Sequence, residues 1–170
     1  MSANVKEGDL AIVTTTNENG MVSIEVLESI TTNHKTVSSV KTPKAYVKQK
    51  FDGMEYVEYS YMRDIANKYY PDWCWTVIKT EFAGTAAYVV HGRLSWTENG
   101  LKKWGDATAS HRIQKKRGSE EYVDLGNDIK AANTDCIKKA FNMFMNISDD
   151  IYRNQIEETE LTRDETTKVH

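Results

Sequence analysis

The chain has 170 residues, of which 39% are hydrophobic and 10% aromatic, which is enough for one domain with a core and excludes a wholly disordered protein. No apolar run approaches the roughly 20 residues that a membrane helix needs, and the first residues lack the basic-then-apolar pattern of a secretion signal. We therefore expect a soluble, cytoplasmic protein with no membrane partner.

The net charge of −3 is unevenly distributed along the chain. Residues 1–40 carry two basic against five acidic side chains, residues 41–153 carry 18 against 15, and residues 154–170 carry two against five. The mildly basic centre favours a polyanionic partner. We expect residues 1–40 to form an N-terminal segment with a role in oligomerisation, residues 41–153 the core domain, and residues 154–170 an acidic, flexible tail.

The N-terminal third gives mixed signals. Residues 22–30 fit a short helix or a strand, and the pattern does not distinguish the two. Thr42-Pro43 marks a boundary, after which residues 44–51 have helical composition and end at the turn signal Asp52-Gly53.

Residues 56–70 are predicted to form an amphipathic helix, because apolar side chains recur every four residues and Pro71 stops the pattern. The predicted apolar face consists of Val57, Tyr61, Ile65 and Tyr69.

Three strands are predicted next, over residues 73–82, 86–96 and 101–110. The second alternates apolar and polar side chains with a period of two. Asn99-Gly100, between the second and third strands, is a strong hairpin signal because both residues tolerate positive φ. The three strands are therefore expected to form an antiparallel meander.

A long C-terminal helix is predicted to begin near Asn127. Its apolar stripe comprises Ile129, Ala132, Cys136, Ala140, Met143 and Ile147, widened by Ile137, Phe141 and Phe144. Its polar side carries Lys130, Thr134, Lys138 and Asn142. The predicted fold is thus α+β, with a three-stranded antiparallel meander packed against a long C-terminal helix and preceded by a shorter one.

Neither a metal site nor a cofactor is expected. Cys74 and Cys136 lack CxxC spacing and are predicted to be reduced, buried thiols. The four histidines have no metal-ligand spacing with each other or with the cysteines.

Enzymatic chemistry is also unexpected, because no phosphate-binding glycine loop is present and the predicted strands carry almost no acidic residues. Asp124, Asp128 and Asp135 are spaced by four and seven residues, and ion pairing with neighbouring lysines on a helix explains that spacing.

The densest positive run lies at residues 111–117 and contains Arg112, Lys115, Lys116 and Arg117. A solvated loop is one interpretation, and a surface that tracks phosphates beside the sheet is the other. Lys102, Lys103 and Arg93 lie on the predicted hairpin and would extend that surface. Aromatic residues are plentiful, and most are expected in the core or at a subunit interface.

Residues 132–141, which read Ala-Asn-Thr-Asp-Cys-Ile-Lys-Lys-Ala-Phe, resemble a signature of the Rad-fifty-two superfamily of single-strand annealing proteins. The family pattern is Ala-x-Thr-Asp-x-Leu-Lys-(Arg/Lys)-Ala-hydrophobic. Residues 56–58, 63–68 and 73–75 resemble the family's shorter helix and the strand entry that follows it. The resemblance spans roughly residues 44–152 and includes the order of the elements.

The resemblance implies a protein that assembles into rings or helical filaments and holds single-stranded DNA in a basic groove. Lys138 and Lys139 take the place of the family's groove-floor pair, and Arg112 to Arg117 that of an outer basic segment. The family has a basic residue on its first helix, and this residue has no clean counterpart here, because Tyr61 lies nearest that position. The yeast-type pattern favours Arg63, which is therefore included as a DNA-binding candidate. Where the eukaryotic family members have a large C-terminal region, this chain has a short acidic tail. That difference points to a phage or mobile-element protein acting in a bacterial cytoplasm. The tail is a candidate contact for a single-strand-binding or replication protein.

The implied function is ATP-independent annealing of complementary strands during homologous recombination. Passive coating of single-stranded DNA without annealing is the alternative. A metal-dependent nuclease and a structural oligomer are further alternatives.

Overall fold

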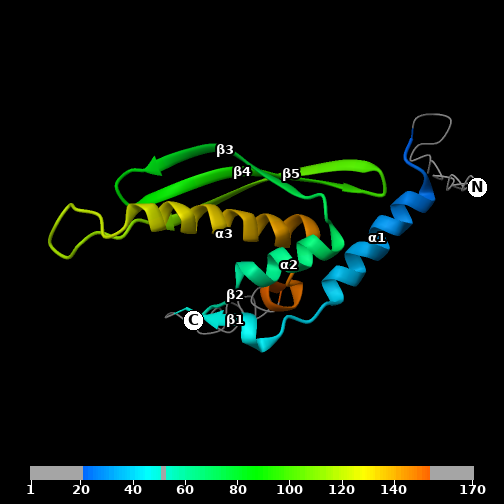
Figure 1. Ribbon diagram of the computed structural model, residues 1–170, viewed down its shortest axis with the longest axis horizontal. Helices are drawn as coiled ribbons and strands as arrows, with labels where there is room; N and C mark the ends of the chain where they lie inside the picture. The colour runs from blue at the N-terminus through cyan, green and yellow to red at the C-terminus, as the bar shows by residue number, and fades with distance from the viewer. Residues whose placement is uncertain (1–20, 51–52, 154–170) are drawn as a thin grey trace, which may run out of the picture.

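The structure is a computed structural model that describes residues 21–50 and 53–153 (Figure 1). Its elements in chain order are α1 (Ile24–Ser39), a 3-10 turn η1 (Lys44–Tyr46), β1 (Val47–Gln49), β2 (Glu55–Val57), α2 (Tyr59–Tyr69), β3 (Cys74–Ala83), β4 (Ala87–Glu98), β5 (Leu101–Arg112) and α3 (Leu125–Met145). The predicted tail over residues 154–170 lies outside the described residues.

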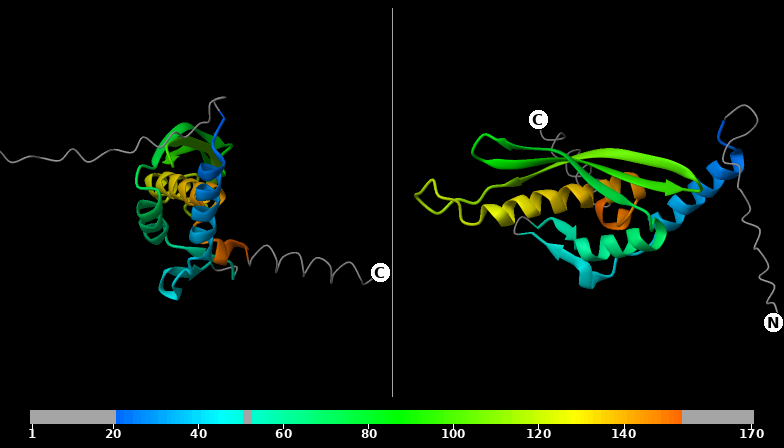
Figure 2. Two further views of the ribbon diagram at one scale, coloured as in Figure 1. Left: turned by 90° about the vertical axis from the view of Figure 1, so that its right-hand side faces the viewer. Right: turned by 45° about the horizontal axis from the view of Figure 1, so that its top comes forward.

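The predicted α+β class is confirmed, with a three-stranded antiparallel sheet of order β3-β4-β5 packed against α3. Figures 1 and 2 show α3 between this sheet and a second layer made of α2 and the β1–β2 hairpin, while α1 runs along one side. Within the described part of the chain, no helix has the length and apolar character needed to cross a membrane.

The hairpin between β4 and β5 forms where the sequence predicts it. Asn99 has φ 48° and Gly100 has φ 78°, so both central residues occupy the left-handed region that a two-residue hairpin turn requires. Glu98 then pairs with Leu101, and the register continues to Ala87 and Arg112 without a shift. The turn therefore fixes which face each residue of β5 presents.

Two glycines on the inner face of the sheet allow rings to pack closely. A Cβ at Gly92 would lie 2.0 Å from the ring of Trp75, and one at Gly105 would lie 2.5 Å from the ring of Phe144 on α3. The aromatic rings fill the space that these glycines leave, which brings α3 close to the strands.

The predicted helix over residues 44–51 is wrong. Only η1 is helical, and β1 follows it and pairs with β2 in the register Val47 to Val57. The turn is closed by a hydrogen bond from the Lys50 N–H to the Met54 carbonyl, with Gly53 at φ 86°. A helix of two turns is marginal in isolation, and pairing with a partner strand outweighs its weak helical preference.

α2 begins at Tyr59 rather than at residue 56, because residues 55–57 pair with β1. Its buried positions are Met62 and Ala66, so the predicted apolar face is displaced by one position. Val57 is fully buried but belongs to β2, and Tyr61, Ile65 and Tyr69 are half-buried at the margins of that face. The helix ends at Tyr69, before Pro71, as predicted.

α3 begins at Leu125 with Asp124 as its N-cap, earlier than the predicted start near Asn127. The Asp124 carboxylate accepts a hydrogen bond from the Asn127 N–H. Asp124 is therefore the cap, and Asn127, the predicted cap, is the residue whose N–H it binds. Most of the predicted stripe is buried, but Met143 is exposed. The helix ends at Met145, and its C-cap Asn146 has φ 58°, so Ile147 reaches the core from beyond the helix.

α1 resolves the ambiguity over residues 22–30, which form the start of a helix capped by Ser23. The Glu98 carboxylate at the end of β4 joins this helix to the sheet. Glu98 accepts hydrogen bonds from Asn33 Nδ2 at 2.8 Å and from Lys103 Nζ at 2.9 Å, and it lies 3.3 Å from His34 Nε2. The carboxylate is almost fully buried, so these contacts replace its hydration.

The two thiols have different environments. Cys136 is buried as predicted, lies within hydrogen-bonding distance of the Val90 and Ala107 carbonyl oxygens, and has its pKa raised by burial. Cys74 is exposed at the start of β3, so its predicted burial is wrong. Cys74 pairs with Ser95 on the outer face of the sheet, whereas the next residue, Trp75, faces α3 and donates a hydrogen bond to Asn133.

Candidate nucleic-acid interface

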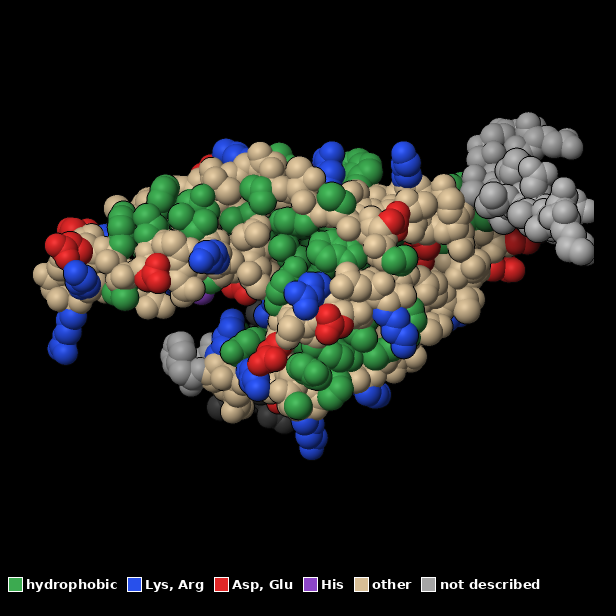
Figure 3. Space-filling model, in the orientation of Figure 1, with side chains coloured by type: hydrophobic (Ala, Val, Ile, Leu, Met, Phe, Trp, Pro, Cys, Tyr) green, Lys and Arg blue, Asp and Glu red, His purple; other side chains and the backbone are tan. Residues whose placement is uncertain are grey.

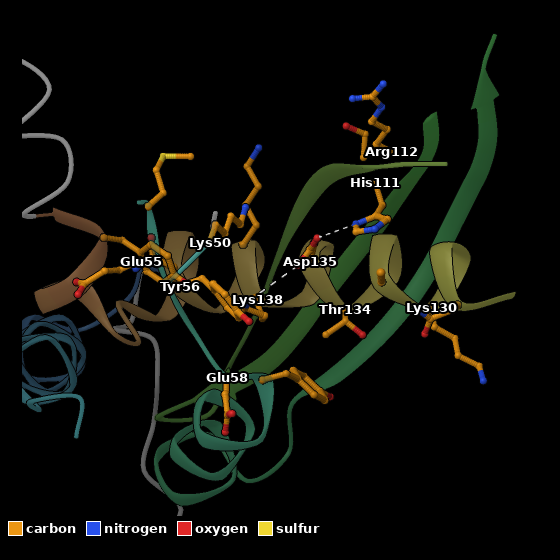
Figure 4. Close-up of a pocket in the computed structure, with 18 residues that line it drawn as sticks. Lys50, Glu55, Tyr56, Glu58, His111, Arg112, Lys130, Thr134, Asp135 and Lys138 are labelled. Carbon is orange, nitrogen blue, oxygen red and sulfur yellow. Dashed lines mark ion pairs between the residues drawn. The ribbon is translucent and has the colours of Figure 1, made fainter. Parts of the chain in front are cut away.

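A groove of about 1150 Å³ runs between the polar face of α3, the end of β5 and the β1–β2 hairpin (Figure 4). This volume exceeds the upper range of a typical small-molecule pocket, so the groove suits an extended ligand. Five cationic side chains line it against three acidic ones: Lys50, Arg112, Lys130, Lys138 and Lys139 against Glu55, Glu58 and Asp135. Its walls also carry the phenols Tyr56, Tyr59 and Tyr152.

Lys138 lies at the floor of this groove, with only 12% of its side chain exposed. Its ammonium lies 4.9 Å from the centre of the Tyr56 ring and 4.0 Å from the Asp135 carboxylate. Burial lowers the pKa of Lys138, the Asp135 charge opposes that shift, and Lys50 adds to it. A bound phosphate would compensate for the hydration that the ammonium has lost.

Lys139 lies on the sheet side of the groove. Its Nζ donates to the Thr108 carbonyl at 3.2 Å, which directs the ammonium along β5. Because this partner is neutral and the side chain is exposed, the charge of Lys139 stays available to an anion. The two adjacent lysines thus line different parts of one groove, Lys138 beside Tyr56 and Lys139 beside β5.

His111 bridges two carboxylates beside these lysines. Its Nδ1 lies 3.5 Å from Asp135 and its Nε2 lies 4.0 Å from Asp128, and Figure 4 shows the ring turned toward α3. Asp128 is buried and accepts a hydrogen bond from the Gln114 N–H at 3.0 Å. Ion pairing with lysine therefore explains Asp135 but not Asp128 or Asp124, which caps α3.

The remaining predicted residues are dispersed over the surface. Arg63 lies on α2 and is not among the residues that line the groove; its guanidinium lies 6.0 Å from the ring of Tyr59 and 3.4 Å from Asp64. Arg112 is at the groove's edge, where Figure 4 shows its guanidinium pointing away from α3.

The hairpin residues fall on two faces, because successive side chains of a strand point in opposite directions. Lys103 shares the inner face with Trp96 and binds the buried Glu98 at the hairpin end, whereas His111 lies at the far end of β5. The structure therefore does not bring Lys103 to the groove. Arg93 and Lys102 lie on the outer face of the sheet, turned away from α3.

The two lysines of the basic run are paired with acids that follow it. Lys115 forms an ion pair with Glu120, and Lys116 lies 2.6 Å from Glu121. A bridge between residues 115 and 122 folds the loop back on itself and brings these side chains together. Arg117 is exposed at the turn of this loop.

Sequence reasoning missed Lys50, Lys130, Tyr56 and His111 as groove-lining residues. For Lys130 a signal existed, since it shares the polar side of the long helix with Lys138. For Lys50 and Tyr56 no signal existed, because their wall is formed by the β1–β2 hairpin, part of which was predicted to be helical.

Within residues 21–50 and 53–153, no group of three or more histidine, cysteine, aspartate or glutamate side chains could hold a metal ion. No model of a known protein family matches the chain, and no curated protein matches it either. The resemblance to the Rad-fifty-two superfamily therefore stays a prediction drawn from sequence motifs.

Proposed function

We propose that the chain binds single-stranded DNA in the groove between α3 and the β1–β2 hairpin and promotes the annealing of complementary strands without ATP. The observation that carries the proposal is the placement of Lys138 and Lys139, which line one groove whose cations outnumber its acids. These are the two residues that the helix motif singles out on independent grounds.

Annealing requires neutralisation of the backbone rather than the making or breaking of bonds. Two complementary strands repel one another through their phosphates, and each also folds on itself. Ammonium groups on the groove's floor and sides would hold the backbone of one strand extended, with its bases free to test a second strand. Base pairing then supplies the driving force. The tyrosines of the groove offer surfaces on which an unpaired base can stack.

Assembly of several copies forms part of the proposal. β3 is an edge strand whose apolar side chains Val77, Ile78 and Phe82 are 46%, 54% and 50% exposed. A free edge with exposed apolar side chains favours association, and a neighbouring copy would cover it. A ring or filament would align successive grooves, so that weak contacts act together through effective concentration.

Replacing both lysines tests the groove. Each lysine that contacts a phosphate contributes about 0.7 to the salt dependence of binding to a single strand, so Lys138→Ala with Lys139→Ala should lower the slope by about 1.4 and weaken binding at moderate salt. The measurement is the anisotropy of a labelled oligo(dT) over a range of salt concentrations. Lys68→Ala, which removes an exposed lysine from α2, is the matched control and should change neither quantity.

Equal slopes for the double variant and the Lys68→Ala control would refute the groove assignment. Light scattering of the same samples determines whether assembly is retained. Annealing of complementary oligonucleotides at the protein-free rate would leave passive coating as the function. Cleavage of labelled DNA with magnesium or manganese would instead support a nuclease.

A further inference from the structure

The outer face of the sheet carries an aromatic side chain that the fold does not require. Trp104, on β5, is 63% exposed and is not part of the core cluster. The Arg93 guanidinium lies 4.1 Å from the centre of its ring, and Asp106 holds that guanidinium with two bonds of 2.7 and 2.8 Å. The ion pair therefore stacks on one face of the indole and leaves most of the side chain in solvent.

This bracing gives Trp104 the properties of a stacking platform. A bidentate ion pair between neighbouring strands fixes the guanidinium, and the guanidinium in turn restricts the indole. A side chain held in place before binding loses little conformational entropy when it contacts a ligand. A flat, preorganised indole favours ligands that are themselves flat.

The charge of the same face favours an anion. Besides Arg93, which is balanced by Asp106, the face carries Lys79 balanced by Glu81, and two further cations, Lys102 and Arg112, of which Arg112 also lines the groove. One further acid, Asp72, hydrogen-bonds Thr97, which pairs with Lys102. Lys102 lies two residues before Trp104, about 7 Å along the strand, and Arg112 lies eight residues after it, about 26 Å away. Figure 3 shows Lys and Arg side chains standing out along the sheet side of the molecule.

We propose that this outer face is a second binding site for single-stranded nucleic acid, centred on Trp104; it meets the groove at Arg112, which ends β5 and also lines the groove. A base stacks on the free part of Trp104, and the backbone runs along β5 between Lys102 and Arg112. The sheet itself separates this site from the inner lysines of α3, so one subunit can hold two strands at once. The choice of nucleic acid as the ligand rests on the proposed function, whereas the location of the site does not.

The test uses the full chain with the groove disabled by Lys138→Ala and Lys139→Ala. Oligo(dT) should still bind this variant and quench part of its tryptophan emission. Adding Trp104→Ala should weaken the remaining binding about 5- to 150-fold, the range expected from the loss of one stacked base. Leu27→Ala, which truncates another exposed apolar side chain, is the control and should change nothing.

The two proposals fail in different ways. If the groove variant loses all binding, or if Trp104→Ala adds no further loss, the outer site is refuted while the groove proposal stands. The exposed Trp104 is then better explained as a contact for another protein. If the unmodified chain binds no oligonucleotide, both proposals fail. In the otherwise unmodified chain, Trp104→Ala should lower the number of nucleotides bound per subunit, and an unchanged stoichiometry would also refute the second site.

Discussion

Replacing Glu98 by alanine should weaken the attachment of α1 to the sheet at a cost of about 3 kcal/mol in the free energy of unfolding. Only 5% of the Glu98 side chain is exposed, whereas its partner Lys103 is 29% exposed. Removal of the carboxylate leaves the Lys103 ammonium, the Asn33 amide and the His34 ring without their shared acceptor.

The magnitude follows from the burial of the pair. Removing one member of a fully buried ion pair costs about 3–5 kcal/mol, and Lys103 can recover some hydration because it is partly exposed. A loss of about 3 kcal/mol corresponds to a fall of roughly 6–12 °C in Tm for a chain of this size. Glu58→Ala is the control, because Glu58 pairs with Lys48 at 3.4 Å in an exposed position, where a pair contributes less than about 1 kcal/mol.

The assay is urea unfolding followed by tryptophan fluorescence, repeated across pH. Burial raises the pKa of Glu98, but the hydrogen bonds from Asn33 and Lys103 outweigh this effect and lower the pKa below its ordinary value. A carboxyl whose pKa is lower in the folded state stabilises the protein above its unfolded pKa, and that contribution disappears as pH falls through the folded value. The difference between the unmodified chain and Glu98→Ala should therefore be constant near neutral pH and shrink below about pH 4.5. The reasoning is refuted if Glu98→Ala costs no more than Glu58→Ala, or if the difference persists in acid.

Two further substitutions probe the packing and the basic loop. Gly105→Ala would place a Cβ 2.5 Å from the Phe144 ring and should cost about 1–3 kcal/mol in thermal or chemical unfolding, whereas Gly126→Ala in α3, whose Cβ meets only Asp124 Oδ1 at 3.5 Å, should be neutral or stabilising. Equal effects of the two would contradict the close approach of α3 to the sheet. Glu120→Gln with Glu121→Gln removes the acids that pair with Lys115 and Lys116, so the salt slope of oligo(dT) binding should rise by up to about 1.4, while an unchanged slope would show that this loop does not contact the strand.

The parts of the fold that the sequence predicts are those whose signals are local. Asn99-Gly100 specifies its hairpin because the turn depends on two residues that tolerate positive φ. The helix predicted over residues 44–51 fails because a short segment takes its structure from its partner, and β2 lies several residues away. No pattern within the segment itself encodes that pairing.

The residues of the candidate site also fall into those that local sequence patterns predict and those that only tertiary packing brings together. The four-residue spacing of Lys130, Thr134 and Lys138 places them on one side of α3, and the structure confirms that these three residues line one groove. The opposite wall could not be predicted, since Tyr56 reaches Lys138 only through tertiary packing. The sequence predicts Lys102 and Lys103 on one surface because both lie on the same hairpin, yet the alternation of a strand places adjacent side chains on opposite faces.

The charges of the groove also bear on why the proposed function needs several copies. Five lining cations against three acids leave a net charge of about two per groove. If that charge neutralises two phosphates, the salt slope is about 1.4, and a tenfold rise in salt weakens binding by one groove only about 25-fold. So few phosphate contacts give weak binding by an isolated subunit. Tight binding would therefore require one strand to occupy successive grooves, and the exposed edge of β3 is the surface through which neighbouring subunits would align them.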